Sequence, residues 1–193
     1  MQLQLLLRAA LCLTLIIIGA KVQIPLPYFD YYTLQFTFVL LTAVLLPMRY
    51  AISVMGSYIL LGLIGVPVFA AGGGLGYVLR PSFGYLIGFL ATIACISGLY
   101  RAYPVTSRFH FFLLNFLGII ITYIFGLGYK GLIINLYMNQ ILPVWTIMTS
   151  AFAFDIPADV IMICLLSLVE PRIVKAITHS THSWQVKESN YCD

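Results

Sequence analysis

Charged residues are scarce in this chain. Only 8% of its 193 residues are Asp, Glu, Lys or Arg, whereas 62% are hydrophobic, and the mean hydropathy is +1.02. A typical soluble domain is about 25% charged and about 45–50% apolar, and a globule of this size has too little interior to bury so large an apolar share. The composition therefore excludes a soluble monomer and indicates a polytopic membrane protein.

The motifs of the common ligand-binding and catalytic classes are absent as well. The four cysteines form no Cys-x-x-Cys pair, and three of them stand in apolar runs, where a thiol packs as a small hydrophobic group. The chain has no Gly-Lys-Ser/Thr phosphate loop, no Gly-x-Ser-x-Gly nucleophile elbow and no His-Glu-x-x-His zinc motif. Its ten Lys and Arg residues are scattered and form no nucleic-acid-binding patch. We therefore expect no metal, no cofactor and no nucleic-acid partner, and any active transport must draw its energy from another subunit.

Uninterrupted apolar runs indicate the number of membrane spans. The stretches without Asp, Glu, Lys or Arg are 31–48, 50–79, 81–100, 109–129 and 131–154. A helical crossing takes about 20 residues, and Pro and Gly divide the second stretch. The predicted crossings are 3–20, 33–48, 50–66, 83–100, 109–128 and 145–170. The sequence thus predicts an all-α integral membrane domain over residues 1–175 with six transmembrane helices, followed by a polar C-terminal tail at 176–193.

The distribution of basic residues predicts the orientation, because cytoplasmic loops are enriched in Lys and Arg. If the N-terminus is inside, the cytoplasmic segments hold Arg8, Arg49, Arg101, Arg108, Arg172, Lys175 and Lys187, and the outer loops hold Lys21, Arg80 and Lys130. Seven against three places both termini in the cytoplasm. The Gly-rich loop between the third and fourth helices then lies on the outer side, together with Pro157-Ala158-Asp159. This clustering indicates a site that opens outward.

The glycine run Gly72-Gly73-Gly74 allows two interpretations. Non-helical backbone at membrane depth is tolerated where it is buried or lines a cavity, and its free polar groups can then meet a ligand. Glycine also serves plain turns and close helix packing. The residues alone leave a ligand loop and a simple turn equally open.

Two acidic residues, Asp155 and Asp159, lie where the last helix meets the outer side. They are four residues apart and hence share one helical face. An ionisable group at membrane depth is costly and is a functional hypothesis by default. Asp159 is also a suitable N-cap, since it precedes an apolar run. The two roles are compatible, because a capping carboxylate can keep one oxygen for a ligand.

Three segments carry a resemblance to a known family. Gly65-Val66-Pro67-Val68-Phe69 leads into Gly72-Gly73-Gly74 and then into Pro81-Ser82-Phe83-Gly84-Tyr85. In this order they resemble the BioY proteins, the biotin-capturing S components of energy-coupling-factor (ECF) transporters, in which a Gly-x-Pro-Val-Phe stretch precedes a glycine-rich turn and a Pro-x-x-Gly-Tyr segment. The resemblance extends from Gly19-Ala20 to Pro157-Ala158-Asp159 and so covers most of the chain.

The resemblance implies a six-helix, multi-pass protein of the bacterial cytoplasmic membrane that binds biotin near the extracellular face. The resemblance further implies that the chain is not an enzyme and that its partners are a transmembrane coupling subunit and two ATP-binding cassette subunits that hydrolyse ATP. Helix 1 of such proteins commonly packs against the coupling subunit through small residues spaced by four, which Ala10 and Thr14 match here. The same small residues could instead pack within this subunit.

Two departures from the family pattern concern cations. Met162 stands where the family's Pro-Gly-Asp-x-x-Lys has its lysine, and Arg80 stands at the first position of the Gly-Pro-Thr-Gly-Gly-Tyr segment. Relative to the family pattern, the chain lacks the lysine at position 162 and has an additional cation at Arg80. An S component for a related vitamin or precursor is therefore an open alternative.

A biotin site needs an acceptor for the ureido N–H groups, a donor for the ureido carbonyl and apolar walls for the rings. In the expected site Asp159 is the acceptor, and the donor is either Gln35 or the loop N–H groups around Gly73 and Gly74. Phe69, Tyr77 and Tyr85 form the walls, and the valerate carboxylate lies near Arg80, Lys130 or solvent. Two other possibilities are a membrane-embedded enzyme with Asp155 and Asp159 as an acid pair, and a packing subunit without a ligand.

Overall fold

The computed structural model describes residues 2–24, 32–103, 107–137, 149 and 155–189, with the backbone alone at 2 and 178–189. These ranges contain six α-helices, a two-stranded antiparallel hairpin, a 3-10 helix and a π-helical turn. The elements are α1 (Gln2–Lys21), β1 (Gln23–Ile24), β2 (Tyr32–Thr33), α2 (Gln35–Leu45), α3 (Met48–Leu63), η1 (Leu75–Leu79), α4 (Phe83–Ala102), α5 (Arg108–Leu132), η2 (Ile133–Tyr137) and α7 (Ile156–Ser189). The predicted all-α class is confirmed, and the Gly-rich segment connects α3 to α4.

The helices differ in length more than the predicted spans do. Within the described residues, three segments are long and apolar enough to cross a membrane, namely Leu3–Lys21, Phe83–Ala102 and Arg108–Tyr137. The α2 and α3 helices are apolar but shorter. At 1.5 Å per residue, the 11 residues of α2 extend about 16 Å, roughly half of a bilayer core of about 30 Å. The predicted crossings at 33–48 and 50–66 are therefore longer than the helices at these positions.

The end of α3 has a local cause. Gly65 has a φ of 106°, a conformation that L-residues with a side chain rarely adopt. Its N–H donates to the Gly62 carbonyl at 3.2 Å, and the Val66 N–H donates to the Leu61 carbonyl at 3.1 Å. This pattern is a Schellman motif, which terminates a helix. The helix consequently stops at Leu63, three residues before the predicted end.

The last helix ends later than predicted. Its predicted beginning at 145–154 lies, except for Thr149, outside the described residues. The α7 helix then continues through Pro171 to Ser189, beyond the expected end at 170. The division between a membrane domain and a tail at residue 175 stays a prediction.

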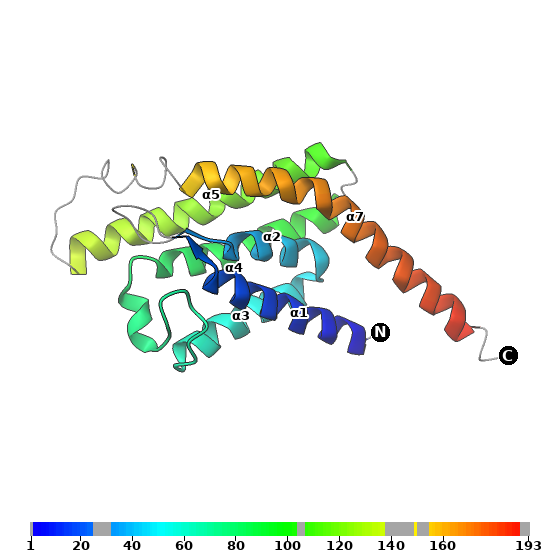
Figure 1. Ribbon diagram of the computed structural model, residues 1–193, viewed down its shortest axis with the longest axis horizontal. Helices are drawn as coiled ribbons and strands as arrows, with labels where there is room; N and C mark the ends of the chain where they lie inside the picture. Colours follow the sequence, from blue (N-terminus) through cyan, green and yellow to red (C-terminus); the bar gives the residue numbers. More distant parts are fainter. Residues whose placement is uncertain (1, 25–31, 104–106, 138–148, 150–154, 190–193) are drawn as a thin grey trace.

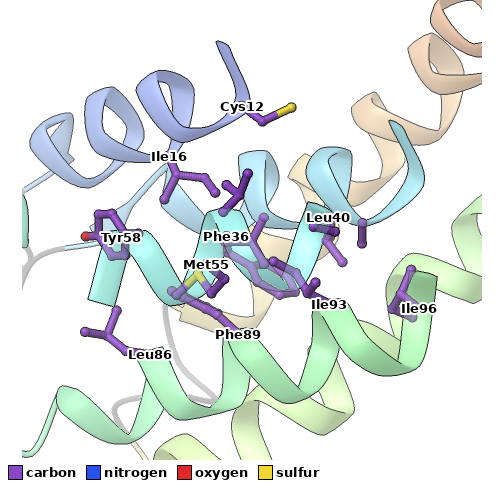
Figure 2. Close-up of a cluster of buried hydrophobic side chains, with 14 of the residues drawn as sticks. Cys12, Ile16, Phe36, Leu40, Met55, Tyr58, Leu86, Phe89, Ile93 and Ile96 are labelled. Atoms are coloured by element: carbon purple, nitrogen blue, oxygen red, sulfur yellow. The ribbon is translucent and has the colours of Figure 1, made fainter. Parts of the chain in front are cut away.

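The hydrophobic core receives side chains from all six described helices, and Figure 2 shows the part of it between α1, α2, α3 and α4. Figure 2 shows Phe36 and Leu40 from α2 pointing toward Phe89 and Ile93 from α4, and the Phe36 and Phe89 rings stack with their centroids 5.8 Å apart. Because these side chains are buried among other apolar groups, the helices keep a fixed mutual orientation at the point where α2 and α4 begin.

Glycines bring α4 and α5 into close contact. A Cβ atom on Gly88 would lie 2.8 Å from the Thr122 carbonyl oxygen, which belongs to the backbone of α5. Small residues at such crossings let helix backbones approach, which is the usual source of helix association in membranes. Thr122 and its neighbour Tyr123 are thereby held at a fixed distance from α4.

Replacing Gly88 with alanine is expected to separate these two helices and to lower the free energy of unfolding by about 1–3 kcal/mol, the usual cost of overpacking. Gly128→Ala is the matched control, because nothing lies within 4 Å of a Cβ at that position. Thermal unfolding in detergent would measure both variants. Equal melting temperatures for the two would contradict the close α4–α5 contact.

Figure 1 shows which ends of the helices lie together. The start of α1 and the end of α7 point toward one end of the molecule. The β1–β2 hairpin and the starts of α4 and α7 point toward the other end (Figure 1). If the termini are cytoplasmic, as predicted, the hairpin end faces outward.

Candidate ligand-binding site

A pocket of about 120 Å³ lies at the hairpin end, where α2, α4 and α7 begin and α5 ends. Aromatic and polar side chains from all four helices, the hairpin and the α3–α4 connection form its lining. The lining residues are Tyr32, Thr33, Gln35, Phe36, Ala70, Tyr77, Ser82, Tyr85, Leu86, Phe89, Thr122, Tyr123, Lys130, Asp155 and Asp159. Five of the nine expected substrate-binding residues are among them: Asp159, Gln35, Tyr77, Tyr85 and Lys130.

Asp159 lies in the first turn of α7 and is 5% exposed. The Tyr32 hydroxyl donates to its Oδ1 and the Tyr123 hydroxyl donates to its Oδ2, both at 2.8 Å. A carboxylate oxygen can accept a further hydrogen bond, and a helix N-terminus favours negative charge. Asp159 is thus fixed from two sides and still able to accept hydrogen bonds from a ligand.

The Tyr32 phenol is suited to this donor role. Burial, and then the negative charge of Asp159, raise the pKa of Tyr32 above its ordinary value. The hydroxyl therefore keeps its proton at neutral pH. Since Tyr32 belongs to β2 and Asp159 to α7, the bond joins the hairpin to the last helix.

Gln35 supplies an unused donor. Its side chain is 3% exposed, and its Nε2 has no hydrogen-bond partner. The nearby Tyr58 hydroxyl donates to the Val68 carbonyl at 3.2 Å, and its oxygen does not accept a hydrogen bond from Gln35 Nε2. Leaving a buried donor unpaired costs about 1–3 kcal/mol. Such a group at the wall of a pocket points to a ligand that carries an acceptor.

The walls between these polar groups are aromatic. The rings of Tyr85 and Tyr123 meet edge to face at 5.7 Å, and Phe36 and Phe89 form the stacked pair described above. Aromatic rings of this kind provide flat apolar surfaces for a ring-shaped ligand. The pocket lining also includes Tyr123, Tyr32 and Phe36, which the sequence analysis did not select. A buried tyrosine in an apolar helix needs a partner for its hydroxyl, and that requirement was the signal available for Tyr123.

The remaining expected residues lie outside the pocket lining. Phe69 is fully buried behind Tyr77, with the ring centroids 4.5 Å apart. The Gly74 N–H donates to the Gly62 carbonyl at 2.7 Å, and Gly73 lies against the Val66 carbonyl, where any Cβ would collide. These contacts make the glycine segment a turn packed on the end of α3, the second of the two interpretations left open.

Arg80 is also not among the lining residues, although it contacts one of them. Its guanidinium lies over the Tyr77 ring at 5.4 Å from the centroid, a cation–π contact. Among the described residues that line this pocket, Lys130 alone is basic. Of the two expected cations, Lys130 is therefore the one placed to meet an anionic group of a ligand.

The hairpin and the α3–α4 connection are joined beside the pocket. Lys21 Nζ donates to the Phe69 carbonyl at 2.7 Å, and Gln23 Nε2 donates to the Ala70 carbonyl. Ala70 lines the pocket, and Phe69 supports Tyr77 from behind. These bonds hold one wall of the pocket in position.

Comparison with known proteins identifies the family. The chain matches the BioY family over residues 1–179. This chain belongs to the BioY family. The resemblance drawn from the sequence is thus confirmed, and it covers nearly the whole chain.

Two BioY relatives and one solved structure are similar to this chain. A protein named as a probable biotin transporter BioY, from Lysinibacillus sphaericus, is 35% identical over 158 residues, which cover 82% of this chain and 80% of the relative. The biotin transporter BioY of Thermotoga maritima is 41% identical over 86 residues, which cover 44% of this chain and 50% of that protein. The crystal structure of the S component for biotin from an ECF-type ABC transporter superposes with a TM-score of 0.78 at 26% identity, and covers 90% of this chain and 92% of that one. The relatives are membrane transporters, so this BioY chain is a transport protein.

Both acidic residues of the enzymatic alternative line the same pocket of this BioY protein. Asp155 is close enough for its charge to act on Asp159. Each oxygen of Asp159, however, already accepts a tyrosine hydrogen bond. These contacts fix Asp159 as a hydrogen-bond acceptor in the pocket.

Proposed function

We propose that this protein is the substrate-capture subunit for biotin uptake. It takes up biotin in the pocket at the hairpin end and delivers it with an ATP-driven ECF module. The observation that carries this proposal is the pairing, in one buried pocket, of an acceptor carboxylate, Asp159, with an unpartnered donor, Gln35 Nε2. The names of the relatives support the choice of ligand.

The ureido group of biotin fits these two groups. It presents two N–H donors and one carbonyl acceptor, and burying them without partners would cost about 2–7 kcal/mol. Asp159 accepts from the N–H groups, and Gln35 donates to the carbonyl. The ring system then lies against Phe36, Tyr85 and Phe89.

The valerate carboxylate of biotin pairs with Lys130 at the end of α5. We expect Lys130→Gln to weaken biotin binding about fivefold, which is about 1 kcal/mol, the upper end of the range for a partly solvated ion pair. Binding of biotin amide, which has no carboxylate, should stay unchanged. Isothermal titration of both ligands measures the difference.

Arg80→Gln is the matched control for Lys130→Gln, because Arg80 lies over Tyr77 outside the pocket lining. It should leave biotin affinity nearly unchanged. A larger loss for Arg80→Gln than for Lys130→Gln would reverse the assignment of the cation.

The energy for transport comes from partner subunits in this proposal. They are a transmembrane coupling subunit and two ATP-binding cassette subunits of the bacterial cytoplasmic membrane. Ala10 and Thr14 on α1 are both exposed, and the Thr14 hydroxyl donates to the Ala10 carbonyl at 2.9 Å. With its hydroxyl satisfied, Thr14 presents a small apolar surface, so α1 can pack closely on the coupling subunit.

Uptake of radiolabelled biotin tests this function. The full chain is expressed in bacteria that lack biotin transport, with and without the coupling and ATPase subunits, and biotin binding to the purified chain is measured in parallel. Binding by the chain alone, with fast uptake when the module is present, is the expected result. Tight binding of a biotin precursor without biotin binding would favour the related-vitamin alternative, and binding of neither would refute the proposal.

A further inference from the structure

Glu170 and Asn115 form an isolated polar pair in the apolar interior. Glu170 on α7 and Asn115 on α5 are both fully buried. Asn115 Nδ2 donates to Glu170 Oε2 at 2.8 Å. Neither residue lines the pocket described above. The proposed capture of biotin does not use this pair.

The pair contains two buried acceptors without partners, Glu170 Oε1 and Asn115 Oδ1. An ionised carboxylate can only accept hydrogen bonds, as can an amide oxygen. Two orphaned acceptors would therefore remain if Glu170 carried a charge. Within the described part of the chain, Glu170 has no ion-pair partner, and an unpaired buried charge is strongly unfavourable.

We propose that Glu170 is a proton-binding site: its carboxyl group is protonated at neutral pH and forms a cyclic acid–amide pair with Asn115. The Glu170 hydroxyl donates to Asn115 Oδ1, while Asn115 Nδ2 donates to Glu170 Oε2. One proton removes the charge and satisfies both orphaned oxygens.

The pair acts as a second connection between α5 and α7. The first is the bond from Tyr123 to Asp159 at the pocket. Asn115 lies eight residues before Tyr123, about 12 Å along α5, and Glu170 lies eleven residues after Asp159, about 16 Å along α7. Because the two helices run antiparallel, both connections hold the same helix pair at different depths. Loss of the Glu170 proton would weaken this second connection, between Glu170 and Asn115.

The charged and titratable groups around Glu170 do not favour loss of its proton. From α4, the Tyr100 phenol interacts with Glu170, and the Arg101 guanidinium is hydrogen-bonded to Ser97 and to the Leu46 carbonyl. The α2 helix has no titratable residue, and those of α5 near its start, Arg108 and His110, are exposed. On α7 itself, Arg172 and Lys175 are both exposed.

Infrared difference spectroscopy tests the protonation directly. Spectra of the full chain in lipid nanodiscs at neutral pH are compared with those of Glu170→Gln. The carbonyl stretch of a protonated carboxylic acid should disappear in the variant, and Asp159→Asn serves as the control for the pocket carboxyl group. Loss of carboxylate bands in place of the acid band would overturn the proposal.

Thermal unfolding gives an independent test. Glu170→Gln preserves a cyclic pair, so its melting temperature should equal or exceed that of the wild type, and the difference should grow at alkaline pH, where the wild type loses the proton. Asn115→Leu should lower the melting temperature, and adding Glu170→Leu should restore part of the loss, because replacing both partners leaves no orphaned group. A strongly destabilised Glu170→Gln would contradict the cyclic acid–amide pair.

Discussion

Asp159→Ala is expected to reduce biotin affinity by at least about 100-fold. The substitution removes the acceptor for the ureido N–H groups, and hydrogen bonds to charged groups contribute about 1.5–3 kcal/mol each, which corresponds to factors of about 10 to 150. It also leaves the hydroxyls of Tyr32 and Tyr123 without their partner. Biotin titration of the purified protein measures the loss, and a melting curve establishes that the variant is folded.

Asp155→Asn is the matched control for this result. Asp155 lines the same pocket and lies one helical turn from Asp159. Asp155 is half-buried, whereas Asp159 is almost fully buried. We expect a change of less than tenfold in biotin affinity. An equal loss in both variants would mean that the two acids act as a pair, which is the arrangement required by the enzymatic alternative. Unchanged binding in Asp159→Ala would remove the acceptor from the proposed site.

The helical fold could be predicted from the sequence because the membrane imposes strong constraints. Apolar runs of crossing length are rare outside membrane proteins, and a span must satisfy its own backbone hydrogen bonds. The crossing predicted at 50–66 nevertheless extends three residues past the end of α3. Hydropathy does not distinguish helix from a buried apolar loop, and the conformation of Gly65 ended α3 at Leu63.

The hairpin between α1 and α2 had no counterpart in the prediction. Its strands are two residues each, Gln23–Ile24 and Tyr32–Thr33, too short for an alternating pattern to be recognised. It is held by long-range contacts, such as that of Gln23 with the Ala70 carbonyl. Contacts of this kind depend on the tertiary structure and have no local signal.

The pocket-lining residues that could be selected from the sequence are those whose chemistry is unusual in a membrane. Asp159 and Gln35 are polar groups in apolar surroundings, and both line the pocket. The glycine segment was expected to reach the ligand, but Gly74 uses its N–H group to bind Gly62. Composition indicates that glycine allows close approach, whereas the tertiary structure decides which group approaches it.

Gln35→Leu is expected to weaken biotin binding about 10- to 100-fold without lowering the stability of the ligand-free protein. In the free protein Gln35 Nε2 is buried and unpaired, so leucine removes an unsatisfied donor at similar volume and should leave the melting temperature unchanged or higher. In the complex the ureido carbonyl loses its donor and becomes the unpaired group. The affinity and the stability therefore change in opposite directions.

Thr42→Val is the matched control for Gln35→Leu, since Thr42 is also a buried polar residue of α2 but lies outside the pocket, where its hydroxyl donates to the Phe38 carbonyl at 2.7 Å. It should leave biotin affinity unchanged. Differential scanning fluorimetry with and without biotin measures both properties in one experiment. If Gln35→Leu melts at a lower temperature and binds biotin normally, Gln35 supports the fold through a bond such as one to Tyr58, and the ureido carbonyl must find its donor elsewhere. A variant with normal or raised stability and weakened binding separates ligand recognition from folding at this position, because only a ligand turns the unpaired donor into a favourable contact.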